Sequence, residues 1–142
     1  VISQGREVRS DAVGCLVVVE PTVPCGRCST CERGLPNACT ELEVLGVHRW
    51  GGLAQKMVAP ADNVHEFKGA SPRAGVFVEP LAVALWALEK GRVTRDDRVC
   101  VVGGGSIGRA IVLAAKDLGV DVAVLDRSRR RREIARALGA DS

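Results

Sequence analysis

The chain has 142 residues and a formal net charge of +3, and 46% of its residues are hydrophobic while 26% are charged. This balance is typical of a soluble globular protein and excludes a disordered chain, and no apolar run approaches the ~20 residues of a membrane-spanning helix. The length suffices for one domain core or for parts of two. The first residue, Val1, indicates a piece of a longer protein. No signal peptide precedes the polar start, so we expect a cytoplasmic location.

Four of the six cysteines are clustered with the spacing C-x2-C-x2-C-x7-C, namely Cys25, Cys28, Cys31 and Cys39. Two-residue gaps let successive thiolates converge on one ion, and the longer gap brings a fourth from a returning loop, which suits tetrahedral zinc. The intervening residues are turn formers without helical or strand periodicity. We therefore expect zinc to supply the folding energy of this lobe. A site closed by four protein ligands is structural rather than catalytic.

Three alternatives to zinc stay open at this point. Disulfides would require an oxidising compartment, which no secretion signal supports, and the cysteines could also be reduced thiols without a ligand. An iron–sulfur cluster would fit the opening C-x2-C-x2-C, but the ferredoxin run closes with C-x3-C-P, whereas Thr40 follows the fourth cysteine here. The two remaining cysteines, Cys15 and Cys100, lie in apolar runs, and we expect both to be buried.

The run from Glu79 to Leu88 is apolar nearly all round, which predicts a buried helix. Pro80 suits its first turn and Gly91 suits its end. Glu79 stands at the N-terminus, where the helix dipole favours a carboxylate. This residue is either a cap of the helix or an acid with a functional role, and the sequence leaves both open.

A strand, a glycine loop, a helix and a second strand follow one another from residue 99 to residue 125. The loop reads G-x-G-x-x-G, and the residues expected to contact a cofactor are Gly103, Gly105, Ser106, Ile107 and Gly108. The helix is predicted over 107–118 with Gly119 as its cap, and the strands over 99–102 and 122–125. In a Rossmann fold this order wraps the pyrophosphate of a dinucleotide, because the glycines permit a tight turn and a close backbone approach at a helix N-terminus.

Asp126 closes the second strand, where a carboxylate accepts hydrogen bonds from the ribose hydroxyls of NAD and repels the 2′-phosphate of NADP. This favours NAD, although Arg127 and the run of arginines at 129–132 could receive such a phosphate. A second helix is predicted over 129–138 with Ser128 as its cap. Arg131 either reaches back to the ribose or lies in solvent. The arginine run is typical of a solvated helix face, and with four aromatic residues in the chain we expect no nucleic-acid binding.

Taken together, these residues resemble the zinc-containing medium-chain alcohol and polyol dehydrogenases, most closely the sorbitol and threonine dehydrogenase branch. The resemblance is carried by Val18-Val19-Glu20-Pro21 leading into the cysteine cluster, by the segments 45–52, 78–84 and 102–108, and by Asp126 with Arg131. It implies an α/β chain: the C-terminal part of a β-rich GroES-like catalytic domain with a structural-zinc lobe over 1–75, then the first half of an NAD-binding Rossmann domain over 76–142.

The resemblance also implies an activity, a hydride transfer between a small polyol or secondary alcohol and NAD, with a catalytic zinc besides the structural one. The Cys and His-Glu ligands of that zinc come earlier in the family, so we expect the 142-residue chain alone to be inactive. Glu79 matches an acid beside the catalytic zinc, and His48 matches a loop near the substrate pocket. Arg109 departs from the family, which has an aliphatic residue there.

For the complete enzyme the resemblance implies a homo-oligomer, without a membrane or a nucleic acid as partner. The alternative function is a non-catalytic zinc-binding or scaffolding module from a truncated dehydrogenase gene.

Overall fold

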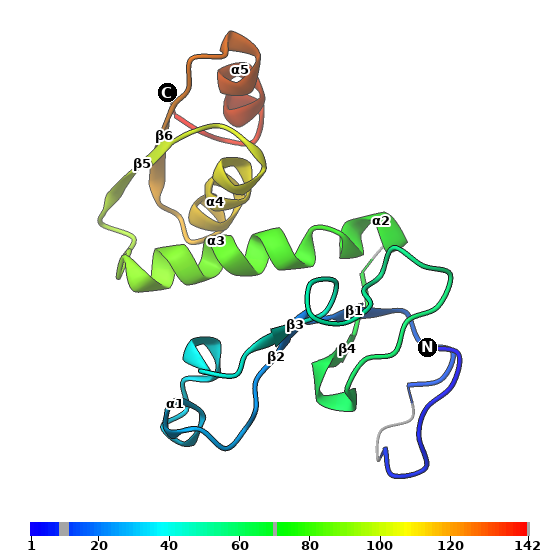
Figure 1. Ribbon diagram of the computed structural model, residues 1–142. Helices are drawn as coiled ribbons and strands as arrows, with labels where there is room; N and C mark the ends of the chain where they lie inside the picture. Colours follow the sequence, from blue (N-terminus) through cyan, green and yellow to red (C-terminus); the bar gives the residue numbers. More distant parts are fainter. Residues whose placement is uncertain (9–11, 70, 142) are drawn as a thin grey trace. The chain divides into compact units, whose positions relative to one another are not determined.

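The computed structural model describes residues 1–8, 12–69 and 71–141. The chain divides into two compact units, Val1–Val76 and Phe77–Ser142, and each is described here by itself (Figure 1). None of the helices in the described ranges combines the length and the apolar character that crossing a bilayer requires.

The first unit consists of short strands joined by long loops. β1 (Val17–Val19) pairs antiparallel with β4 (Val64–Glu66), and β2 (Thr22–Val23) pairs antiparallel with β3 (Glu43–Val44). Its helical segments are single turns: α1 (Ser29–Glu32), η1 (Pro36–Ala38), η2 (Ala61–Asn63) and α2 (Pro72–Gly75).

Few side chains are buried in this unit. Among its described residues, only Cys39 and Asn63 are less than a tenth exposed. The Asn63 Nδ2 group donates to the carbonyl oxygens of Glu20 and Thr22, at 2.9 and 2.7 Å, which ties η2 to the corner between β1 and β2. Polar contacts and clustered sulfurs therefore hold this unit, in agreement with the expectation that the cysteine lobe lacks an apolar core of its own.

The second unit contains the strand–helix–strand order that the sequence predicts. β5 (Arg98–Val102) and β6 (Asp121–Leu125) pair in parallel, with Val99 opposite Val122, and α4 (Ser106–Asp117) connects them. The unit begins with α3 (Val78–Lys90) and ends with α5 (Arg129–Ala137). The predicted bounds are thus confirmed to within one or two residues, because the signals that set them are local.

The core of the chain lies in the second unit, where α4 meets the sheet and α3. Small side chains on α4 let it approach closely, and their neighbours on the strands are valines. The buried members are Ala110, Val112, Ala114 and Ala115 from α4, Val101, Val122 and Val124 from the strands, and Ala84 and Leu88 from α3. The predicted caps are also present, since the Ser128 hydroxyl accepts from the Arg131 N–H and Gly119 has a φ of 80°.

Two expectations about burial are wrong. Within α3 only Ala84 and Leu88 are buried, while Leu85 and Trp86 are 49% and 50% exposed, because the neighbouring α4 covers a single stripe of the helix. Cys100 is exposed and Cys15 is half-buried. Side chains alternate along a strand, so Cys100 points away from the helix-covered face on which Val101 is buried.

Candidate functional site

The four clustered cysteines meet at one point of the first unit. The Sγ atoms of Cys25, Cys28, Cys31 and Cys39 all lie within 4.8 Å of one another. The Cys28 sulfur is 3.5 Å from that of Cys31 and 3.9 Å from that of Cys39. A zinc tetrahedron with bonds of ~2.3 Å to sulfur has edges of about 3.8 Å. The set therefore fits a single zinc ion.

The local backbone brings these thiols together. Cys28 precedes α1 and Cys31 lies inside it, and residues three apart share one face of a helical turn. The loop turns at Gly26 and Gly34, whose φ values of 74° and 76° favour glycine. The 3-10 turn η1 ends just before Cys39 and returns the chain to the cluster.

Hydrogen bonds from nearby groups reach two of the sulfurs. The N–H groups of Cys25 and Glu41 donate to Cys39 Sγ at 3.3 and 3.4 Å. The Thr30 hydroxyl lies 3.0 Å from Cys28 Sγ and, with the N–H groups of Cys31 and Thr40, lowers the pKa of Cys28 to about 4. Donors aimed at a sulfur stabilise its anion, which is the form that binds metal.

Cys31 is shifted the other way. Burial raises the pKa of the Cys31 thiol to about 12, and the adjacent Cys28 sulfur adds to this shift. Neighbouring thiolates repel one another unless a cation neutralises them, and a bound metal deprotonates a coordinating thiol outright. The cluster thus has the donor chemistry of a closed thiolate site that needs a metal to be fully ionised.

The glycine loop between β5 and α4 has the geometry that its motif requires. Gly103 has a φ of 108°, in the region that favours glycine. A Cβ on Gly108 would lie 1.9 Å from the Gly103 carbonyl oxygen, so only glycine lets helix and turn meet. A Cβ on Gly105 would meet no atom within 4 Å. The backbone at Gly105 is therefore open to a ligand at the N-terminus of α4, as a pyrophosphate cradle requires.

Asp126 ties the end of β6 to this loop. One carboxylate oxygen accepts from the Ser128 N–H at 2.8 Å, and the other accepts from the Gly104 N–H at 2.8 Å. The Arg131 guanidinium lies 3.4 Å away, and the carboxylate side chain is 8% exposed. The N–H of Ser128, followed by that of Gly104, holds the pKa of Asp126 below its ordinary value. This acid is therefore ionised and keeps unused lone pairs for ribose hydroxyls.

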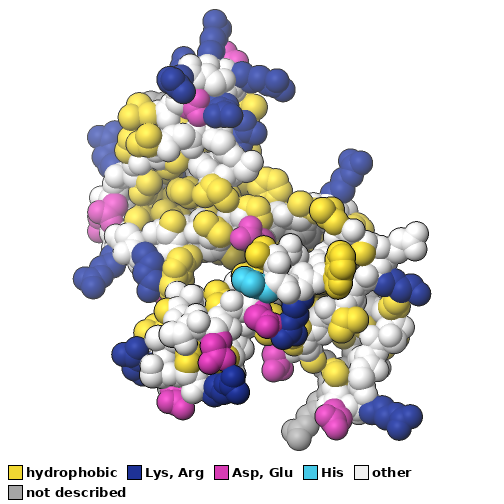
Figure 2. Space-filling view, viewed as in Figure 1, with side chains coloured by type: hydrophobic (Ala, Val, Ile, Leu, Met, Phe, Trp, Pro, Cys, Tyr) yellow, Lys and Arg dark blue, Asp and Glu magenta, His cyan; other side chains and the backbone are white. Residues whose placement is uncertain are grey.

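Arg131 reaches back toward Asp126 from the first turn of α5, one of the two positions considered for it. Lys and Arg side chains gather over α5 in the space-filling view (Figure 2). One of them, Arg129, pairs with Glu133 at 2.8 Å and is 87% exposed. Arg129 and Arg130 therefore lie on a solvated helix face, while Arg131 is directed at the carboxylate and the half-buried Arg132 donates to the carbonyl oxygen of Asp126 at 2.6 Å.

His48 lies exposed in the loop that follows β3. Its Nδ1 atom accepts from the Val44 N–H at 2.9 Å, so the neutral ring carries its proton on Nε2. The next residue, Arg49, pairs with Glu43 of β3. In this arrangement His48 can donate a hydrogen bond through Nε2, but its Nδ1 lone pair is occupied.

Glu79 lies exposed in the first turn of α3, at the helix N-terminus that its sequence position predicts. It belongs to the second unit and His48 to the first. No other described side chain shares a hydrogen bond or an ion pair with Glu79. Its position agrees with a carboxylate at the positive end of a helix.

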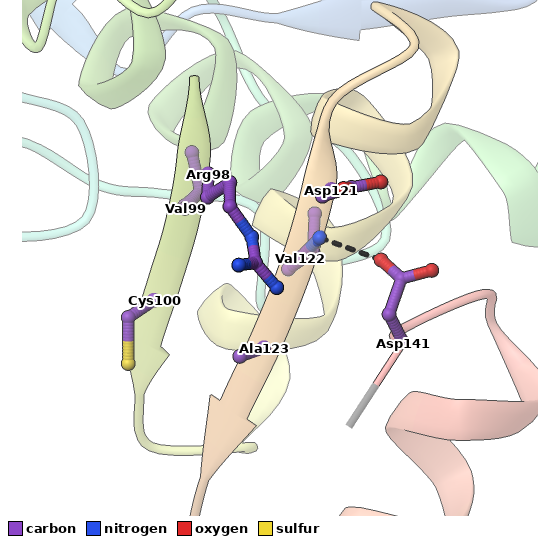
Figure 3. Close-up of a pocket in the computed structure, with 7 residues that line it drawn as sticks. All are labelled: Arg98, Val99, Cys100, Asp121, Val122, Ala123 and Asp141. Atoms are coloured by element: carbon purple, nitrogen blue, oxygen red, sulfur yellow. Dashed lines mark hydrogen bonds between the residues drawn. The ribbon is translucent and has the colours of Figure 1, made fainter. Parts of the chain in front are cut away.

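A shallow hollow of about 270 Å³ lies on the sheet of the second unit (Figure 3). It is lined by Arg98, Val99, Cys100, Asp121, Val122, Ala123 and Asp141. Six of these residues lie in the first three positions of β5 and β6, and Asp141 follows α5, whereas ligands of open α/β sheets bind beyond the strands' carboxyl ends. The hollow is therefore distinct from the glycine loop.

Sequence reasoning missed two contacts. The Thr30 hydroxyl shares a hydrogen bond with the Cys28 sulfur, and a hydroxyl two residues after a cysteine is the available signal. The Arg109 Nε group donates to the carbonyl oxygen of Gly104 at 3.0 Å, although the motif alone assigns no partner to that residue.

The chain is similar to known proteins. Residues 1–69 match the family model of the alcohol dehydrogenase GroES-like domain. The sorbitol dehydrogenase of Arabidopsis thaliana is 35% identical over 142 aligned residues, which cover 96% of this chain and 38% of that protein. The chain thus spans about two fifths of the length of the curated relatives it matches.

Two solved structures carry a cofactor. An Escherichia coli alcohol dehydrogenase in complex with NADH is 41% identical, with a TM-score of 0.91, and the match covers 98% of this chain and 42% of that one. A Sinorhizobium meliloti protein bound to NADP is 33% identical, with a TM-score of 0.95, and the match covers 99% and 42%. Residues 1–69 are therefore similar to an alcohol dehydrogenase GroES-like domain, and nearly the whole chain is similar to parts of zinc-type alcohol and polyol dehydrogenases.

Proposed function

We propose that this chain is the part of an NAD-dependent alcohol or polyol dehydrogenase that carries a structural-zinc lobe and the first half of the cofactor domain. The observation that carries the proposal is that one chain holds both a four-thiol cluster with zinc dimensions and a parallel strand–glycine loop–helix–strand unit ending in Asp126. The proposed domains cover residues 1–75 and 76–142. Because the chain spans two fifths of its relatives, the reaction belongs to the complete protein.

In this proposal the zinc of the lobe is held by Cys25, Cys28, Cys31 and Cys39. Four protein sulfurs leave no open coordination position, so this metal stabilises the lobe and takes no part in catalysis. Metal binding can replace the apolar core that the unit lacks, because a site that exists only in the folded state adds its binding energy to folding. Zinc-binding thiolates are expected in a reducing compartment, so we propose the cytoplasm as the location of the protein.

The dinucleotide is proposed to bind over the glycine loop. The open backbone at Gly105 and the free N–H groups at the start of α4, near Ser106 and Ile107, suit the pyrophosphate. The ionised Asp126 carboxylate suits the 2′-hydroxyl of NAD and opposes the 2′-phosphate of NADP, with Arg131 holding the carboxylate in place. We propose NAD as the preferred cofactor on this charge argument, while the related structures include both NADH and NADP complexes.

The substrate is proposed to be a small polyol or secondary alcohol, since a relative is a sorbitol dehydrogenase. When bound, a catalytic zinc polarises the alcohol or carbonyl oxygen as a Lewis acid, and the nicotinamide exchanges the hydride. Glu79 is proposed to supply a carboxylate near that metal in the complete protein. His48 is proposed to donate a hydrogen bond from Nε2 to a substrate hydroxyl, because its Nδ1 is already occupied. A homo-oligomer is proposed for the complete enzyme.

Metal content and cofactor binding test the proposal together. The purified protein is expected to contain zinc bound by the cluster, with the amount reduced by one ion per chain in Cys39→Ser. Cys100→Ser is the matched control, because Cys100 is an exposed thiol outside the cluster. Isothermal titration with NADH and with NADPH is expected to show binding with NADH preferred. Zinc without any nucleotide affinity would support the alternative of a zinc-binding module, and iron in place of zinc would contradict the assignment of the metal.

A further inference from the structure

The peptide of Gly104 is held from both sides. Its N–H group donates to the Asp126 carboxylate at 2.8 Å, and its carbonyl oxygen accepts from the Arg109 Nε group at 3.0 Å. Gly104 is itself buried, and a Cβ built on it would lie 3.3 Å from the Arg131 Cβ atom. The middle of the glycine loop is thus fixed by the Asp126 carboxylate at the end of β6 and by the Arg109 guanidinium in the first turn of α4.

These two hydrogen bonds affect the order of the loop, because its glycine residues have no side chains that could restrain it. Gly103, Gly104 and Gly105 are consecutive, and glycine loses more conformational freedom on ordering than any other residue. A loop that is ordered before its ligand arrives does not lose that freedom on binding. The side chains of Asp126 and Arg109 therefore act on the same peptide that positions the open backbone of Gly105.

Arg109 also brings a charge to the loop. Its backbone N–H donates to the Gly105 carbonyl in the first turn of α4, which fixes the base of the side chain beside the loop. Among the described residues its Nη groups have no hydrogen-bond acceptor and no acidic partner. A half-buried guanidinium without an anion leaves a positive charge next to the helix N-terminus, where an anionic group is favoured.

We propose that Arg109 is a positioning residue for the dinucleotide: it locks the Gly104 peptide, orders the loop in the absence of ligand and adds positive charge at the pyrophosphate cradle. The inference rests on the proposed cofactor site and extends it, since the glycine motif assigns no role to this position. It predicts that the arginine acts on pyrophosphate-bearing ligands and on the order of the empty loop.

Arg109→Met and Arg109→Lys test the role, with Arg136→Met as the matched control because Arg136 is an exposed arginine in the last turn of α5. A charge-assisted hydrogen bond contributes enough that its loss is expected to weaken binding of ADP-ribose and NADH about tenfold in Arg109→Met. Arg109→Lys retains the charge and a donor, so it is expected to recover most of the affinity. Arg136→Met is expected to bind both ligands as the parent protein does.

Hydrogen–deuterium exchange of the ligand-free protein supplies a readout independent of binding. Peptides that span residues 103–107 are expected to exchange faster in Arg109→Met than in the parent, with the remainder of α4 unchanged. Affinity and loop exchange equal to the parent in Arg109→Met would overturn the inference while leaving the cofactor site standing. A parent protein without affinity for ADP-ribose or NADH would overturn the proposed cofactor site, and with it the role assigned to Arg109.

Discussion

Gly108 and Gly105 lie three residues apart in the same loop and offer a matched pair of substitutions. A Cβ on Gly108 would sit 1.9 Å from the carbonyl oxygen of Gly103 and 3.3 Å from a methyl group of Val101. A Cβ on Gly105 would touch nothing within 4 Å, and the φ of −73° at Gly105 is one that alanine adopts readily. The same added methyl group therefore has opposite expected effects at the two positions.

For Gly108→Ala we expect a large loss of stability. The carbonyl of Gly103 is backbone, so relief of the contact requires α4 to move away from β5 by about 1 Å or more, and overpacking of this kind costs about 3 kcal/mol. The better helix propensity of alanine offsets about 1 kcal/mol of that cost. The net destabilisation of about 2 kcal/mol corresponds to a fall in melting temperature of roughly 10 °C for a small domain.

For Gly105→Ala we expect no loss of stability and a gain of up to about 1 kcal/mol, because alanine restricts the unfolded chain. We expect Gly105→Ala to weaken the binding of the dinucleotide instead, since the added methyl group would occupy the open space over the loop. Circular dichroism during heating and urea titration measures the stability of both variants. NADH fluorescence measures their affinity.

Two results with these variants would refute the reasoning. If Gly108→Ala melted with the parent protein, the close approach of helix and turn would be wrong. If Gly105→Ala bound NADH as the parent does, the open space at Gly105 would not be the pyrophosphate cradle.

The remaining predictions concern single side chains. Because the N–H donors hold the pKa of Asp126 below its ordinary value, its ionised form stabilises the fold above an unfolded-state pKa of about 3.9 and this contribution is lost as pH falls through the lower folded-state pKa. Asp126→Asn should therefore be less stable than the parent at pH 7, with the difference shrinking below about pH 4 in urea titrations; a difference independent of pH would contradict the assigned hydrogen bonds. Asp126→Ser in the complete enzyme should reduce the ratio of NAD to NADP use, measured as kcat/KM, and an unchanged ratio would mean that Asp126 does not contact the ribose. Asn63→Ala leaves two carbonyl groups without their donor and should destabilise the first unit by about 2 kcal/mol in chemical denaturation, whereas no change would mean that water replaces the amide. The 142-residue chain alone should not oxidise alcohols, and chelator-sensitive turnover would show that it holds its own catalytic metal.

The cysteine cluster and the glycine loop could be predicted because their signals are short in sequence. The gaps between Cys25, Cys28, Cys31 and Cys39 already limit how far the thiols can separate, and the structure brings all four within 4.8 Å. The strand, glycine loop and helix follow one another without interruption. The predicted bounds of these elements therefore differ from the observed ones by one or two residues at most. The roles of His48 and Glu79 came from the family resemblance, and they stay predictions.

The sequence by itself determined the local order of the chain: the thiol spacing, the parallel strand–helix–strand unit, its caps and the acid at its end. Only the tertiary structure decided which apolar residues are covered, because burial depends on neighbours that are distant in sequence. It leaves Trp86 and Cys100 exposed although their surroundings in sequence are apolar. It also decided that Asp126 and Arg109 meet at the two sides of the Gly104 peptide, since hydrogen bonds require a direction that no motif specifies.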